Sequence, residues 1–149
     1  MKQNVPYLFD NPHWQVDPVR NLDIFFANLP GMVPPEAVLC LAEGSWSKEG
    51  KVFIRTHMQP NSATPSLPSE FQNAPRIPVN KETMLALSEM ATRHAAPEIA
   101  IHLCVCTRDT SILEWYDLTG DPITISLSVP EVEVARFAGK CGIRFRIQE

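Results

Sequence analysis

Three side chains that can bind metals or act as nucleophiles alternate along one apolar run. His102, Cys104 and Cys106 stand two residues apart, so in a β-strand their side chains share one face. Zinc binds histidine and cysteine, but chelating cysteines are usually separated by two or more residues, so that a turn can wrap the ion. A flat strand has no such turn. We therefore expect no metal site, and we interpret the run as a central strand with buried thiols and one hydrogen-bonded histidine.

Nucleophilic catalysis is the second chemistry that these residue types could support. A thiol of this run could pair with His102 or His94, but catalysis needs a lowered thiol pKa and access to solvent, which central strands rarely give. Ser45-Trp46-Ser47-Lys48 matches the S-x-x-K pattern of serine acyl enzymes. Those enzymes carry the pattern on a buried helix, whereas here it lies in a predicted hairpin loop. We expect neither reaction.

Carboxylates accumulate between residues 109 and 133, where the chain has no lysine or arginine. The six acidic residues are Asp109, Glu114, Asp117, Asp121, Glu131 and Glu133. Three interpretations are open. The residues are turn formers and helix caps, or a surface for a basic protein partner, or paired carboxylates of a hydrolytic or metal-assisted reaction.

We predict a binding surface for a basic protein, formed by Glu114, Trp115, Tyr116, Asp117 and Asp121. Trp115 or Tyr116 would be its aromatic anchor. Trp115→Ala and Asp117→Lys should then abolish binding and leave thermal stability nearly unchanged. By analogy of size and charge, the chain is expected to be a small bacterial-type binding protein, like many inhibitory or immunity proteins.

Two alternatives to this binding module remain open. One is a small hydrolase-type enzyme that uses Asp117, Glu114 or His102 in a cleft under a proline-rich loop. The other is a homodimer that pairs through an exposed edge strand.

Size and composition set the broad class of protein. The chain has 149 residues, of which 44% are hydrophobic, and a net charge of −4, as expected for one globular domain with a single core. The negative charge argues against nucleic-acid binding, which needs cations to replace phosphate counterions. We see no membrane-spanning run and no signal peptide, so we expect a cytoplasmic protein with reduced thiols. Six glycines and no phosphate-binding motif predict that no cofactor is bound.

An α+β domain is expected to position these residues. Ile99 to Thr107, Ile112 to Leu118 and Ile123 to Val129 are β-type runs joined by short polar turns, which predicts an antiparallel meander. The first run is apolar on both faces and should be central. Further strands are expected over Ala37 to Glu43, Lys51 to Met58 and Ile143 to Ile147, giving a largely antiparallel sheet of about six strands.

Three helices are expected on one face of this sheet. The first begins with Asp17 as N-cap (a strand over Asp23 to Ala27 is the alternative), and the second runs from Asn80 to about Ala95. The third follows a capping box, Ser128-x-x-Glu131, and ends at Gly142 in the left-handed conformation.

The remaining segments are expected to be irregular. Residues 1–17 should form an arm packed on the single domain of residues 1–149. Residues 59–79, with five prolines and no glycine, should form a long loop, because proline removes backbone donors and fixes φ.

Overall fold

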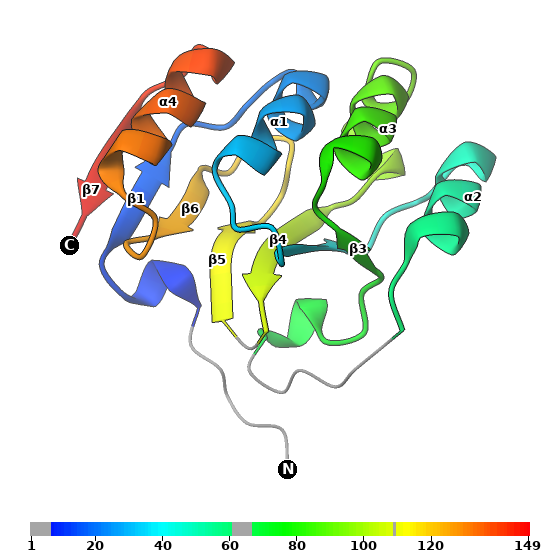
Figure 1. Cartoon of the computed structure of the whole chain (residues 1–149), viewed down its shortest axis with the longest axis horizontal. Helices are drawn as coiled ribbons and strands as arrows, with labels where there is room; N and C mark the ends of the chain where they lie inside the picture. Colours follow the sequence, from blue (N-terminus) through cyan, green and yellow to red (C-terminus); the bar gives the residue numbers. More distant parts are fainter. Residues whose placement is uncertain (1–6, 61–66, 109) are drawn as a thin grey trace.

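The computed structural model describes residues 7–60, 67–108 and 110–149. In these residues the chain forms one antiparallel sheet of seven strands, in the order β3-β2-β4-β5-β6-β1-β7 (Figure 1). The strands are β1 His13–Val16, β2 Val38–Ala42, β3 Arg76–Pro78, β4 His102–Thr107, β5 Thr110–Trp115, β6 Ile123–Ser126 and β7 Phe145–Gln148. The predicted α+β class and antiparallel sheet are confirmed, with one strand more than expected.

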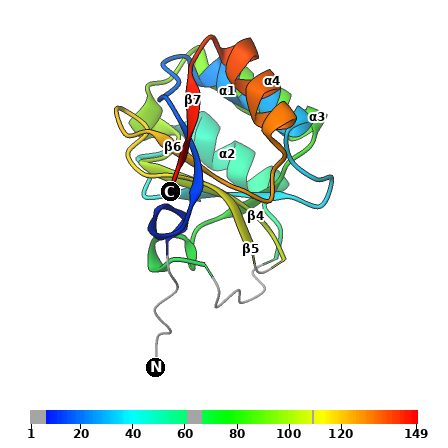
Figure 2. The same ribbon diagram turned by 90° about the vertical axis from the view of Figure 1, so that its left-hand side faces the viewer.

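Four α-helices of the described residues cover one face of the sheet, one more than the three that the sequence predicted. They are α1 Leu22–Asn28, α2 Lys48–His57, α3 Lys81–Ala91 and α4 Glu131–Cys141. Four short 3-10 helices are η1 Leu8–Asp10, η2 Leu29–Gly31, η3 Ser69–Phe71 and η4 Ala96–Glu98. Figure 2 shows η1 and η3 on the side of the sheet away from the α-helices. We call that side the helix-free face.

Two neighbouring rows of register partners cross the whole sheet with opposite chemistry. The apolar row consists of Ile77, Leu39, Val105, Leu113, Ile125, Trp14 and Ile147. The polar row consists of Arg76, Cys40, Cys104, Glu114, Thr124, Gln15 and Arg146. Register partners point to the same face, and chain neighbours point to opposite faces. The apolar row therefore faces the helices, and the polar row faces the helix-free side.

The predicted meander is confirmed as β4, β5 and β6, and β4 lies inside the sheet as expected. Asn80 caps α3 as predicted, because its Oδ1 accepts the Thr83 N–H at 2.9 Å. Gly142 ends α4 with φ 68°, in the left-handed region that the sequence predicted.

The predicted strand over Lys51 to Met58 is wrong, because this segment belongs to helix α2. Ser47 Oγ accepts the Gly50 N–H at 3.1 Å and caps the helix. Gly50, Phe53 and Ile54 are the buried residues of α2, and their spacing is helical. The predicted hairpin loop at residues 44–50 is wrong for the same reason.

Two predicted helix starts are also wrong. Helix α1 begins at Leu22 with Asn21 as N-cap, and the Asp17 N–H donates instead to the Arg144 carbonyl. Helix α4 has Pro130 as N-cap, while Ser128 Oγ lies 2.9 Å from Ser126 Oγ. The residues before both helices are needed to cross from a strand to the helical layer.

The irregular segments contain more structure than the sequence predicted. Residues 13–16 form β1, which pairs with both β6 and β7, although the sequence predicted an arm over residues 1–17. In the proline-rich segment the described residues form η3 and β3. Strand β3 lies at the edge of the sheet, where a strand tolerates proline.

Within the described residues, the structure has no helix with the length and apolar character needed to cross a bilayer.

Candidate functional site

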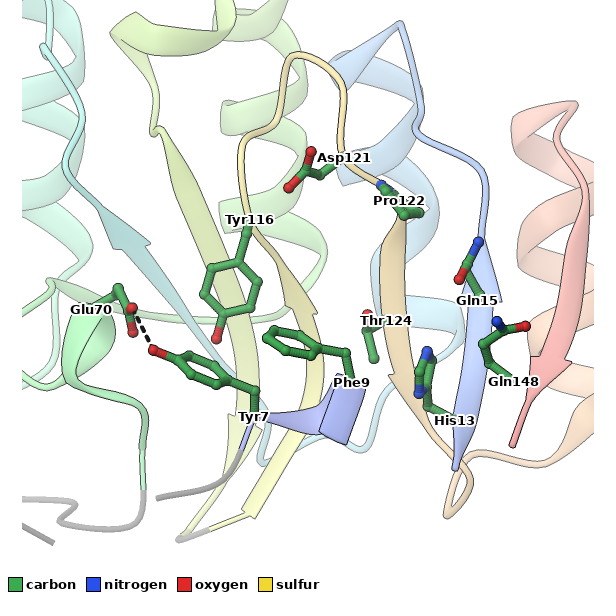
Figure 3. A pocket seen from close by; sticks show the side chains of 10 residues that line it. All are labelled: Tyr7, Phe9, His13, Gln15, Glu70, Tyr116, Asp121, Pro122, Thr124 and Gln148. Atoms are coloured by element: carbon green, nitrogen blue, oxygen red, sulfur yellow. Dashed lines mark hydrogen bonds between the residues drawn. The ribbon is translucent and has the colours of Figure 1, made fainter. Parts of the chain in front are cut away.

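The helix-free face has a covered half and an open half. Over β2 and β4, residues 67–74 form a cover whose Leu67, Phe71 and Ala74 pack on the buried thiols of Cys40, Cys104 and Cys106. Over β6, β1 and β7 the face holds a hollow of about 600 Å³ (Figure 3). We call this hollow the pocket. Its lining residues are Tyr7, Phe9, His13, Gln15, Glu70, Tyr116, Asp121, Pro122, Thr124 and Gln148.

Three aromatic rings pack together at the pocket. Tyr7 and Phe9 are stacked with their centroids 4.9 Å apart. Tyr116 meets both rings edge-on, at 5.4 Å from Tyr7 and 5.9 Å from Phe9. Phe9 nevertheless leaves 49% of its surface exposed, so its ring still has apolar area that a ligand could cover.

Two glutamates lie behind these rings. Tyr7 Oη donates to Glu70 Oε1 at 2.8 Å, and the dashed line in Figure 3 marks this bond. Glu114 is 1% exposed, and its Oε1 accepts from Tyr116 Oη and from the Leu8 N–H, both at 3.0 Å. These bonds join η1, η3 and β5 into the wall of the pocket.

Burial and hydrogen bonding raise the pKa values of three side chains in this wall. Desolvation raises the pKa of Glu114, although hydrogen bonds from Leu8 and Tyr116 oppose the shift. Burial also raises the pKa of Tyr116, and the hydrogen bond to Glu70 raises that of Tyr7. Both tyrosines are therefore neutral donors at physiological pH.

The lining of the pocket is acidic. It contains the carboxylates of Glu70 and Asp121, and none of its described residues is lysine or arginine. Arg146 is the register partner of Gln15, so it projects from the same face at the edge of the sheet.

The structure brings only part of the predicted surface together. Tyr116 and Asp121 line the pocket, and Glu114 supports Tyr116 from below. Trp115 is fully buried in the helix-side core, so the prediction of Trp115 as an exposed anchor is wrong. Asp109 lies outside the described residues.

Asp117 belongs to a turn outside the pocket. Its carboxylate accepts hydrogen bonds from the backbone and side chain of Thr119. Its backbone N–H donates to His102 Nδ1 at 2.9 Å, and its φ of 54° is left-handed. Hydrogen bonds of this kind are typical of an aspartate that stabilises a turn. Turn formation was one of the three interpretations of the acidic residues between positions 109 and 133.

Sequence reasoning missed more than half of the pocket. Tyr7, Phe9, His13, Gln15, Glu70 and Gln148 come from segments far from the meander. The N-terminal aromatic residues were the only available signal, because Tyr7 and Phe9 make that segment too apolar for a solvated tail.

The thiols differ in electrostatic environment. Desolvation raises the pKa of Cys104, and the hydrogen bond to Cys106 together with burial raises that of Cys40, against the hydrogen bond from Cys104. Hydrogen bonds from Cys104 and Cys40 lower the pKa of Cys106. No group of three or more histidine, cysteine, aspartate or glutamate side chains in the described residues is placed to hold a metal ion.

Glu114→Gln should raise stability at neutral pH. The folded-state pKa of Glu114 is above its ordinary value, so its stabilising contribution is complete below the unfolded-state pKa and is lost as pH rises through the folded-state pKa. Glutamine keeps an oxygen for Leu8 and Tyr116 but carries no charge. We expect a higher urea midpoint than wild type at about pH 7.5, and a smaller difference at about pH 4.

The matched control is Glu36→Gln, which changes an exposed carboxylate. An equal difference from wild type at both pH values for Glu114→Gln would contradict the raised pKa.

Comparison of the chain with protein-family models, with curated proteins and with solved structures finds no match.

Proposed function

We propose that this chain is a protein-binding module, inhibitory in the manner of immunity proteins, and that its pocket receives a cationic group of a basic partner. Phe9 carries the proposal, because a half-exposed aromatic ring lies at a hollow that also contains two carboxylates. Aromatic residues dominate the energetics of protein interfaces, especially where they border a pocket.

An arginine side chain of the partner fits this lining best. Its guanidinium stacks on aromatic rings and binds carboxylates through paired donors. Glu70 Oε1 is held by Tyr7, while the buried Oε2 has no hydrogen-bond partner among the described residues. Glu70 lines the pocket, so its carboxylate provides the negative charge that a guanidinium entering the pocket would meet.

The proposed binding surface contains different residues from the surface that the sequence predicted. It keeps Tyr116 and Asp121, adds Tyr7, Phe9 and Glu70, and leaves Trp115 and Asp117 out. The expectation of a cytoplasmic protein belongs to this proposal as well, since an intracellular inhibitor acts where its target is made.

The enzyme alternative has less support. Of its predicted residues, neither His102 nor Asp117 lines the pocket, and His102 accepts a hydrogen bond from the Asp117 backbone N–H, not from its side chain. Glu114 is held by Leu8 and Tyr116. Pairing of two copies through β7 is opposed by Arg146 on that edge strand, because charged side chains on an edge strand disfavour edge-to-edge pairing.

A photo-crosslinking experiment tests the proposal. Phe9 of the full chain is replaced by p-benzoylphenylalanine, which keeps an aromatic ring at this position. Cells of the source organism are irradiated, and the crosslinked peptides are identified by mass spectrometry. The control carries the same group at Val52, which is 57% exposed on α2.

We expect position 9 to capture one partner at a segment that contains arginine or lysine. Glu70→Gln should then weaken the affinity of that partner about tenfold or more, as for an interface hot spot. Capture at position 9 that does not exceed capture at position 52, or an acidic captured segment, would contradict the proposal.

A further inference from the structure

Cys40 and Cys104 are direct neighbours across two strands. Cys40 of β2 and Cys104 of β4 are register partners in an antiparallel pair. Partners in such a pair have Cα atoms about 4.5–5.5 Å apart, which is within the range that a disulfide spans. Both side chains are fully buried on the helix-free face.

Cys106 is near this pair but is less well placed to bridge it. It lies two residues from Cys104 on the same strand, and its own register partner is Val38. Diagonal positions on antiparallel strands have Cα atoms about 7–8 Å apart, which exceeds what a relaxed disulfide allows. Of the three possible bonds in the cluster, the Cys40–Cys104 bond requires the least strain.

We propose that Cys40 and Cys104 form an oxidation site, at which hydrogen peroxide joins β2 to β4 by a disulfide. A thiolate sulfur attacks peroxide, an S–O bond forms, the O–O bond breaks, and hydroxide leaves and takes a proton. The second thiolate then attacks the sulfenic sulfur, an S–S bond forms, the S–O bond breaks, and the oxygen leaves as water. In total, two thiols are oxidised and one peroxide is reduced to two waters.

The surroundings favour a thiolate at Cys106, whereas the pKa values of Cys40 and Cys104 are raised above that of an ordinary thiol. Arg76 is buried, is the register partner of Cys40, and lies in the polar row on the same face, so its charge favours a nearby thiolate. Hydrogen bonds from the other two thiols lower the pKa of Cys106. A thiol of low pKa is also the better leaving group in thiol–disulfide exchange. A disulfide that includes Cys106 would therefore be exchanged for the disulfide between Cys40 and Cys104.

The proposal requires local opening of the cover, because the thiols and the cover residues Leu67 and Phe71 are buried. The cover is a single layer of chain, with one three-residue 3-10 helix, η3, and short elements of this kind open locally at low free-energy cost. Phe71 of the cover packs on the thiols and lies 5.6 Å from Tyr116 of the pocket. The disulfide would therefore form beside the proposed binding site.

Peptide mapping of the peroxide-treated full chain tests the proposal. All variants carry Cys141→Ser, which removes the half-buried fourth thiol. They are treated with equimolar hydrogen peroxide under native conditions, alkylated, and analysed by mass spectrometry without reduction. Circular dichroism confirms that each variant is folded, and the urea-unfolded chain shows whether the oxidant is sufficient.

We expect the parent protein to lose two hydrogen atoms and to give one linked peptide pair, Cys40 with Cys104. Cys106→Ala should give the same pair, whereas Cys40→Ala and Cys104→Ala should retain both remaining thiols. A bond that includes Cys106, absence of the pair in Cys106→Ala, or a native chain that stays reduced while the unfolded chain is oxidised would each overturn the proposal. None of these outcomes depends on a binding partner, so the proposal stands or fails separately from the proposed function.

Discussion

Trp115→Ala should lower the free energy of unfolding by about 3–5 kcal/mol, as removal of a buried aromatic side chain usually does. The ring is 0% exposed and packs 5.1 Å from the ring of Phe25. Its Nε1 also donates to the Asp121 carbonyl at 2.7 Å, so truncation leaves an empty space and a carbonyl without its donor. Since small domains are stable by only about 5–15 kcal/mol, urea denaturation should show a variant that is largely or fully destabilised.

Phe9→Ala is the matched control, because it also removes an aromatic side chain near the same strand. Phe9 is half exposed, so its removal should change stability by no more than about 1 kcal/mol. A Trp115→Ala protein as stable as Phe9→Ala would show that the Trp115 ring is exposed, as the sequence had predicted.

The error about Trp115 has a simple physical origin. Glu114 and Trp115 are chain neighbours in β5, so they point to opposite faces of the sheet. An antiparallel sheet can leave one face in contact with solvent. The acidic residues near Trp115 in the sequence suggested that its side chain lies on the solvated face. In the structure both residues are buried, because helices cover one face and the N-terminal segment covers the other.

Local signals explain which elements could be predicted. The meander has three dense β-type runs with short turns, and α3 begins at an asparagine that caps it. Gly142 marks the end of α4 because its left-handed φ suits glycine. Each of these signals lies within a few residues of the feature that it predicts.

Strand β1 and helix α2 lacked such signals. Strand β1 has only four residues and is stabilised by pairing with β6 and β7, which are more than a hundred residues away. In α2, Val52, Phe53 and Ile54 follow one another, and such a short apolar run fits a strand or a helix equally well. The Ser47 cap and packing against neighbouring elements decide for the helix.

The pocket could not be predicted for the same reason. Its wall depends on the hydrogen bond from Leu8 to Glu114, which spans 106 residues of sequence. Sheet register brings these segments together, and no connecting turn fixes the register between strands that are so far apart in the sequence. The polar row is recognisable only when all seven strands have been aligned.

Gly44→Ala should cost about 2–4 kcal/mol, which combines overpacking with the loss of one hydrogen bond. A Cβ atom at this position would lie 2.6 Å from Trp46 Cδ1 and 2.7 Å from the Ile99 carbonyl oxygen. The Trp46 indole N–H donates to that same oxygen at 2.6 Å. The methyl group would therefore displace the indole and leave a buried carbonyl without its donor.

Gly120→Ala isolates this steric effect from the general effect of replacing glycine, because no described atom lies within 4 Å of a Cβ built at Gly120. It should change stability by no more than about 0.5–1 kcal/mol in urea denaturation. The Trp46 anchor explains why a tryptophan lies in a segment that resembles an exposed hairpin loop: its ring fixes the chain just before the Ser47 cap. Equal stability of the two alanine variants would mean that the Trp46 contact does not hold this connection in place.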